Sequence, residues 1–365
     1  MRSLVLAALI AIAGASAPAA DRPSFSHEIV VEAPPSLQAT LRQQLREGRT
    51  CAAVARSVGI RLATNVAVVL TRPEGPQAGA GLPATADARV LTATPGTVDE
   101  LARRLDAAAA EGFGVCGLTL TSPVWGRPGG AFAVVAVLTR LNDAPTGVSY
   151  RAIHTSGRGE WADVQRAAAD GFVVTRLASR PQPDVSSTSD IVYLAEKTSA
   201  TRPMKYDLVL AGNGPALQKD LDKSTARGFC AQATWATPER MTVLLAKPID
   251  APCDRPHEYE IEETSTFTGL SVSSSDGALL GIHRVKDGTM ALYDGRDRSL
   301  EYSVAEGVLA DEDSNPIRPS RELRALRDKL NADGDRGFRP VDVAWRATAP
   351  DGPRAVDVIL ARGRN

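Results

Sequence analysis

The chain has 365 residues, 43% of them hydrophobic and 23% charged, which is the composition of an ordinary globular protein. Its 42 Lys and Arg residues nearly balance its 43 Asp and Glu residues, and this excludes a general binder of nucleic acid or of anionic membranes, which would show a basic excess. The length is more than one hydrophobic core usually serves, so we expect several cores.

The first 20 residues predict a signal peptide. Arg2 supplies the positive start, residues 4–13 the apolar core and residues 15–20 the small-residue cleavage region. The apolar run is too short to span a bilayer, and no later run approaches the required length. We therefore expect a periplasmic or secreted protein with no transmembrane segment in the mature chain; an uncleaved N-terminal anchor is the alternative.

The rest of the chain repeats one order of elements: strand, helix, strand, strand. We call the repeats units 1 to 6; they span residues 26–75, 88–143, 147–198, 204–248, 257–295 and 300–362. Their first strands are predicted at residues 27–31, 89–91, 150–153, 206–210, 259–261 and 302–304. The longest loops fall at residues 122–130, 180–190 and 306–319, and a linker rich in Pro, Gly and Ala covers residues 73–87. A period of this kind indicates a repeat architecture.

A glycine ends the predicted helix in five of the units. These helix-end glycines are Gly48, Gly112, Gly171, Gly228 and Gly337. Apolar residues stand seven positions before each of them and eleven before four of them, on one face of the helix, and Phe follows directly in four units. Glycine takes the left-handed conformation that ends a helix without a Cβ penalty. Unit 5 is degenerate: its glycine is Gly277, and its segment 265–276, rich in Ser and Thr, should form a weak helix or none.

The expected fold class is therefore α+β, with six tandem β-α-β-β repeats, antiparallel hairpins and helices packed on one sheet face. One unit alone has a thin core and open sheet edges. Neighbouring units should therefore associate. Pairing predicts three lobes of two units each, and one continuous array is the alternative.

Four cysteines are present, and pairing is the default in an oxidising compartment. Cys230 opens a strand opposite Lys247, and Cys253 follows six residues later, so we expect a Cys230–Cys253 disulfide. Cys51 and Cys116 stand three and four residues after their glycines and could join units 1 and 2. This offset turns them to opposite faces if both strands are regular, which argues against that bridge.

Recognisable catalytic and metal-binding motifs are absent from the sequence. It has no G-x-S-x-G, phosphate loop, dinucleotide fingerprint, H-E-x-x-H or C-x-x-C, and no histidine at ligand spacing. A catalytic role for His27, His154, His257 or His283 would require the fold to bring two of them together. We expect a protein that is not an enzyme and needs neither metal nor cofactor.

Two further features have a structural and a binding interpretation. Trp125, Trp235 and Trp345 fall on or near hairpins, where they would either stack on sugars or pack in the core. Residues 331–337 are weakly similar to a calcium loop, but they lack its Gly at the sixth place and its Glu at the twelfth. The helix-end interpretation explains this run better.

The repeated motif resembles a small bacterial β-α-β-β domain of unknown function. The match rests on the opening Tyr, on Glu111-Gly-Phe113 and Asp170-Gly-Phe172, and on strands that end at Arg140, Lys197, Lys247 and Arg362. This resemblance implies the fold and no activity. A second resemblance is to the sporulation-related peptidoglycan-binding repeat, which also has helices ending in Gly-Phe and which implies binding of glycan strands.

The sequence thus predicts an exported, non-catalytic repeat protein that acts as a binding or scaffolding module in the bacterial envelope. Its partner would be an unknown envelope protein or a glycan. A peptidoglycan-binding protein is one alternative, and a hydrolase-like enzyme with a site between lobes is another.

Overall fold

The structure is a computed structural model. It describes residues 23–58, 65–74, 86–121, 132–140, 147–156, 161–181, 189–237, 239–253, 258–264, 278–285, 288–295, 300–309, 321–347 and 354–363. The predicted signal peptide and the degenerate helix of unit 5 lie outside these residues.

Units 1 to 3 follow the predicted order of elements. They contain β1 (Phe25–Glu32), α1 (Pro34–Arg46), β2 (Thr50–Val54), β3 (Arg56–Val58), β4 (Val66–Pro73), β5 (Asp87–Ala93), the 3-10 turn η3 (Pro95–Thr97), α2 (Val98–Ala110), β6 (Phe113–Thr121), β7 (Ala133–Arg140), β8 (Ser149–Thr155), α3 (Trp161–Ala169), β9 (Val173–Pro181) and β10 (Ser189–Lys197).

Units 4 and 6 repeat this order, and the described part of unit 5 has its three strands. These units contain β11 (Met204–Ala211), α4 (Gly214–Ala226), β12 (Cys230–Thr237), β13 (Arg240–Pro248), β14 (Tyr259–Thr264), β15 (Ala278–Val285), β16 (Gly288–Asp294), β17 (Leu300–Leu309), α5 (Arg321–Asp335), β18 (Arg339–Ala347) and β19 (Arg354–Gly363).

Every unit builds its sheet in the same way. The third strand lies in the middle and pairs antiparallel with the first and the second, in the orders β1-β4-β2, β5-β7-β6, β8-β10-β9, β11-β13-β12, β14-β16-β15 and β17-β19-β18. The first and second strands are therefore parallel to each other, because the helix between them returns the chain to the starting end of the sheet. The α+β class is thus correct, with six small antiparallel sheets, the last of which has β3 of unit 1 as a fourth strand, parallel to β18.

The second strand of every unit contains one residue more than its partner. The register shifts leave Ala52, Cys116, Thr175, Gln232, Leu280 and Val341 unpaired within their sheets. In the five units with a helix-end glycine the unpaired residue is the fourth after that glycine. Each is a β-bulge, which bends the strand and frees backbone groups beside it for other partners.

The middle strands are buried on both faces, and this determines how the units associate. In β4, Val68 and Leu70 belong to a core shared with unit 2, whereas Ala67 and Val69 belong to a core shared with unit 6. Four further cores join unit 2 to 3, 3 to 4, 4 to 5 and 5 to 6. Each pair of successive units, and also the last and first, thus shares one core, and the six units form a closed ring.

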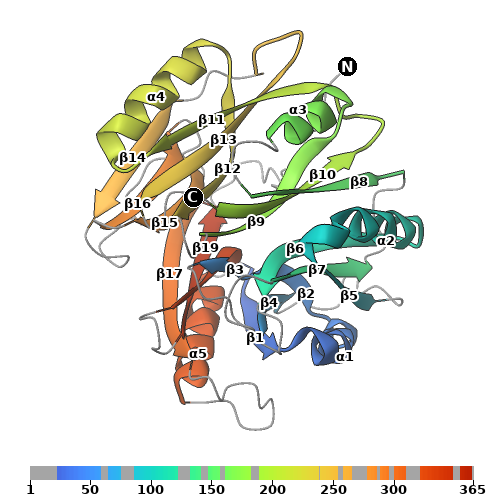
Figure 1. Cartoon of the computed structure of the whole chain (residues 1–365). Coiled ribbons are helices and arrows are strands. Elements are labelled where there is room, and N and C mark those ends of the chain that lie inside the picture. The colour runs from blue at the N-terminus through green and yellow to red at the C-terminus, as the bar shows by residue number, and fades with distance from the viewer. Residues whose placement is uncertain are drawn as a thin grey trace.

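Three lobes of paired units, as the sequence suggested, are therefore wrong. A lobe of two units would need sheets that are apolar on one face and exposed to solvent on the other. Here the middle strands are continuous apolar runs, as is typical of sheets covered on both sides. Each helix covers its own sheet and also packs on the first strand of the next unit: α1 on β5, α2 on β8, α3 on β11, α4 on β14 and α5 on β1. Figure 1 shows the helices around the periphery, with the C-terminal α5 near the N-terminal strands.

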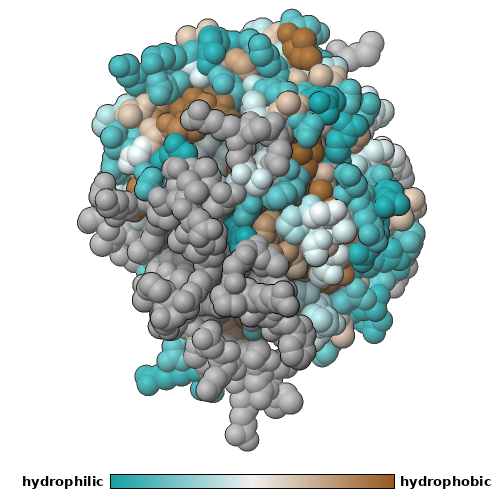
Figure 2. Space-filling model, in the orientation of Figure 1, coloured by the Kyte–Doolittle hydropathy of each residue, from teal (hydrophilic) through white to brown (hydrophobic). Residues whose placement is uncertain are grey.

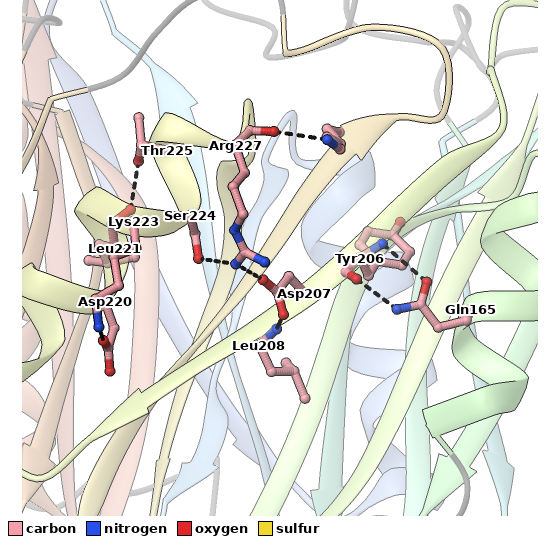
Figure 3. A network of polar contacts seen from close by, with 11 residues as sticks. Gln165, Tyr206, Asp207, Leu208, Asp220, Leu221, Lys223, Ser224, Thr225 and Arg227 are labelled. Atoms are coloured by element: carbon pink, nitrogen blue, oxygen red, sulfur yellow. Dashed lines mark hydrogen bonds and ion pairs between the residues drawn. The ribbon is translucent and has the colours of Figure 1, made fainter.

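A polar side chain of the helix protects the open edge of the next first strand. Asp106 accepts a hydrogen bond from the Tyr150 backbone N–H at 2.6 Å, and Gln165 both accepts from the Tyr206 N–H and donates to the Tyr206 carbonyl. An unpaired strand edge would otherwise invite pairing with another chain. Figure 3 shows Gln165 of α3 reaching Tyr206 in this way.

We call the contact between units 6 and 1 the closing seam. Asn331 of α5 accepts a hydrogen bond from the His27 N–H at 2.6 Å, and Arg327 forms an ion pair with Glu28. A Cβ on Gly334 would come within 2.0 Å of the Phe25 carbonyl oxygen, so only glycine allows α5 this close to β1. The closing seam therefore uses the helix-to-strand contact of the seams between consecutive units, and it adds a parallel pairing of β3 with β18.

The ring has two different faces. Helix ends, with their glycines, and the links between units lie on one face, which we call the glycine face. Turns between second and third strands, and those from first strands into helices, lie on the other, the hairpin face. All three long loops of the sequence therefore begin and end on the hairpin face. Residues 122–130, 182–188 and 310–319 of these loops lie outside the described residues.

Candidate functional site

The glycine face repeats one arrangement in unit after unit. All five predicted helix-end glycines have a positive φ, between 83° and 87°. The following Phe lies beneath cationic side chains: Arg89 and Arg140 over Phe113, Arg151 and Lys197 over Phe172, Arg227 and Lys247 over Phe229, and Arg336 and Arg362 over Phe338. These are cation–π contacts, and they explain why Phe and a terminal basic residue recur together.

The terminal basic residue also caps the helix. Lys197 Nζ donates to the Asp170 carbonyl at 2.8 Å, and Lys247 Nζ donates to the Arg227 carbonyl at the same distance. A cation at a helix C-terminus satisfies a carbonyl and opposes the negative end of the dipole. Figure 3 shows Arg227 turned toward Asp207 and Ser224 at the end of α4. The motif behind the family resemblance is thus a helix-end structure.

Tyrosine at the start of a first strand satisfies the bulge of the preceding unit. The Tyr206 hydroxyl accepts the Val174 N–H at 2.8 Å, and the Tyr259 hydroxyl accepts the Ala231 N–H at 2.5 Å. Burial raises the pKa of Tyr206 to about 12, against a smaller lowering by the Val174 N–H. The neutral phenol therefore accepts a hydrogen bond from the backbone N–H directly before the bulge of an edge strand.

The Cys230–Cys253 disulfide joins β12 to the link after unit 4, as the sequence suggested. Cys253 N–H also donates to the Gly228 carbonyl at 2.9 Å, which holds this link against the end of α4. Cys230 pairs with Ala246 in the sheet, not with Lys247. The bulge in β12 accounts for this shift of one residue.

The structure also forms the Cys51–Cys116 disulfide, which the sequence interpretation disfavoured. The two Cα atoms are 6.2 Å apart, across the seam between units 1 and 2. The argument against this bridge assumed that the strands carrying Cys51 and Cys116 are both regular. Cys116 is itself a bulged residue, and Cys51 directly precedes the bulge at Ala52. Because both strands are irregular here, an offset of one position no longer separates the sulfurs. Two disulfides fit a protein of an oxidising compartment.

A buried polar cluster lies near the hairpin face of unit 3. Arg180 Nε donates to Asp190 Oδ2 at 3.0 Å, and His154 Nε2 lies 3.5 Å from Asp190 Oδ1. The Arg180 guanidinium stacks 4.5 Å from the centre of the Phe132 ring, which comes from unit 2. A buried pair of this kind fixes the geometry of the seam, and its burial supports a structural role.

A second polar pair joins units 4 and 5. Thr234 Oγ1 and His283 Nε2 are 2.7 Å apart, and the side chains belong to residues that are only 3% and 5% exposed. A Cβ on Gly281 would come within 1.9 Å of Thr234 Oγ1, so β15 passes directly against β12. A hydroxyl beside an imidazole can be a nucleophile and its base, but that chemistry needs access for a substrate. The burial of this pair again supports packing.

The remaining sequence candidates are placed as follows. Trp235 is 4% exposed and packs edge-on against Tyr193, so it cannot serve as a sugar platform. Trp125, His257 and the side chain of Trp345 lie outside the described residues. Residues 331–337 form the end of α5, where Asp333 forms an ion pair with Arg336 and accepts a hydrogen bond from Ser303 Oγ. Within the described ranges no group of three or more His, Cys, Asp and Glu side chains could hold a metal ion.

The described surface in Figure 2 is mostly hydrophilic, with small apolar patches. The large apolar side chains exposed among the described residues are Leu210, Ile249, Leu280 and Val341. Leu280 and Val341 are the bulged residues of units 5 and 6. In the part of the chain that the structure covers, no helix is long and apolar enough to cross a membrane.

Comparisons with known proteins gave no relative. The chain matched no family model, no curated protein and no solved structure. The two family resemblances drawn from the sequence motifs therefore stay predictions.

Proposed function

We propose that the protein is an exported, non-catalytic binding or scaffolding module, and that it recognises an envelope partner with the hairpin face of the ring. The contrast between the two turns of each unit supports this proposal. The turn from helix to second strand hardly varies: residues 47–49, 111–112, 170–172, 227–229 and 336–338. The turn from second to third strand ranges from residues 238–239 to residues 122–132.

This contrast favours recognition by loops on a rigid frame. Binding residues concentrate on loops that a scaffold positions, and loops tolerate changes of length. On the glycine face the helix ends are occupied by the cation–Phe contacts that hold the frame. On the hairpin face six turns, from two residues in units 4 and 5 to eleven in unit 2, surround one axis, which suits a large partner better than a small ligand.

Loop replacement tests which face binds. Residues 182–188 join two strands whose last paired residues are Pro181 and Ser189, so Asn-Gly can replace them as a two-residue hairpin. The matched control deletes five residues, 78–82, from the linker between units 1 and 2, which joins the glycine-face ends of β4 and β5. Both variants and the parent chain are then incubated with an envelope protein extract and, separately, with purified cell-wall sacculi.

The proposal predicts that proteins of the envelope extract bind the parent chain. The loop replacement should weaken this binding, and the linker deletion should leave it unchanged. Equal retention of both variants would contradict a binding role for the hairpin face. Retention on sacculi in place of the protein extract would support the glycan-binding alternative.

A further inference from the structure

The closing seam contains a histidine where most other seams have a tyrosine. In the sheet register His27 pairs with Thr71, just as Tyr206 pairs with Ala246, one position before the basic residue that ends the third strand. Tyr150, Tyr259 and Tyr302 occupy this same register position in units 3, 5 and 6. His27 is only 2% exposed, so its ring lies inside the seam.

Pro340 explains why a tyrosine is not needed at this seam. In units 3 and 4 the residue just before the bulge gives its N–H to the tyrosine of the next unit. In unit 6 that residue is Pro340, which has no N–H to give. The side chain at position 27 therefore has a different partner: His27 Nε2 lies 3.0 Å from the Phe338 carbonyl oxygen.

This contact determines which form of the imidazole fits. A carbonyl only accepts, so Nε2 must carry the hydrogen, and the neutral ring then has a bare lone pair at Nδ1. Nδ1 is buried and finds no hydrogen-bond partner among the described residues. Protonation would place a new N–H and a positive charge at this atom. A buried donor without an acceptor is costly, and a buried charge without a partner costs more.

Charged groups from several elements face the ring. Asp333 and Asp335 of α5 favour the protonated imidazole, and Arg339 of β18 disfavours it. Asp333 is already engaged by Arg336 and by Ser303 of β17. On β1 itself the neighbouring Glu28 is paired with Arg327.

Burial, the largest effect, lowers the pKa of His27 below its ordinary value of 6.5 despite the Phe338 carbonyl and the two aspartates. An open seam then binds more protons than a closed one, so closure is weakened as the pH falls below about 6.5. Glu28 acts in the opposite direction. Its burial outweighs the pairing with Arg327 and raises its pKa, so protonation of Glu28 favours the closed seam.

We propose that the closing seam is an acid-sensitive latch, in which protonation of His27 opens the contact of α5 with β1 while the other seams stay closed. The latch concerns the ring itself and does not depend on which partner the hairpin face binds. Opening would remove one of the two contacts that hold unit 1 beside unit 6, and the parallel pairing of β3 with β18 is the other.

Hydrogen exchange of the full chain at pH 7, 6 and 5 tests the latch, with rates corrected for the intrinsic pH dependence of exchange. Amides of β1 and α5 should show an opening equilibrium that grows by at most about tenfold per pH unit, the limit for one proton. The matched internal control is the seam of α3 and β11, which has Tyr206. Its opening should stay unchanged over the same range.

His27→Gln keeps an amide N–H that can donate to the Phe338 carbonyl but removes the titrating ring. It should abolish the pH dependence of β1 and α5. Persistence of the same pH dependence in this variant would overturn the proposal. If His27→Gln does not fold, the parent chain provides the test: exchange of β1 and α5 that follows the α3–β11 control at every pH would equally overturn the proposal.

Discussion

Single side chains connect one unit to the next at positions where the sheet alone leaves a backbone group without a partner. Beside the bulge of the edge strand β9, Tyr206 of the next unit accepts a hydrogen bond from the Val174 N–H. Gln232 Nε2 donates to the carbonyl of the same Val174 at 2.6 Å. Both polar groups of one residue are thus satisfied across a seam, which explains why tyrosine recurs at the start of the units.

Tyr206→Phe should therefore lower the free energy of unfolding by about 1–3 kcal/mol, because it leaves the buried Val174 N–H without an acceptor. Chemical denaturation followed by circular dichroism measures this change. Arg166→Ala, at a side chain that is 70% exposed, is the control and should change stability by less than about 0.5 kcal/mol. A Tyr206→Phe variant as stable as the control would contradict the bridging role of the hydroxyl.

Gly171→Ala isolates the backbone requirement at a helix end. A Cβ there would meet only the Lys197 side chain, at 3.6 Å, so space is not limiting, but φ is +87°. The left-handed conformation should cost alanine about 1–2 kcal/mol of stability. Gly114→Ala is the matched control, since its Cβ meets nothing within 4 Å and its φ is ordinary. Equal stability of the two variants would argue against the cap interpretation.

For single residues, the sequence predicted the features that depend on local spacing along the chain. The helix-end glycines and the Cys230–Cys253 pair could be inferred because a few adjacent residues determine both. The Cys51–Cys116 pair could not, since it depends on bulges that no side-chain pattern reveals. His27 was visible only as a scattered histidine, because its importance comes from Pro340, over 300 residues away in the chain.

Among the elements, the disulfides differ in what they connect. Cys51–Cys116 joins two units across a seam over a sequence separation of 65, whereas Cys230–Cys253 spans 23 residues beside one helix end. Replacing the first pair by alanines should cost about 4 kcal/mol, and replacing the second about 3 kcal/mol, if restriction of the unfolded chain dominates. Equilibrium denaturation of the two double variants gives the comparison. A larger loss for the Cys230–Cys253 variant would contradict this order.

The order of strand, helix, strand and strand was predictable because each element has its own period and its own end signal. The association of the units was not. A continuous apolar middle strand such as β4 shows that both faces are covered, but it does not reveal what covers them. The polar residues that bind the next unit, such as Asp106 and Gln165, look like ordinary surface residues of a helix.

For the whole molecule, closure replaces the open ends of a linear array with one more internal seam. In a linear array unit 1 and unit 6 would each expose an apolar sheet face and would need capping. In the ring Val69 and Val358 share one core instead. The contacts of α5 with β1 and the parallel pairing of β3 with β18 provide this last seam. The acid-sensitive latch acts on the contact of α5 with β1.

Ring closure can be measured directly by cross-linking Glu28→Cys to Arg327→Cys in the same chain. These side chains form an ion pair across the closing seam, and the four native cysteines are held in disulfides. A short bismaleimide should join the two positions within a monomer at neutral pH, which peptide mass spectrometry detects. Glu28→Cys with Lys223→Cys, on α4 of unit 4, is the control and should give no such product. Absence of the intramolecular cross-link between positions 28 and 327 would contradict the closed ring.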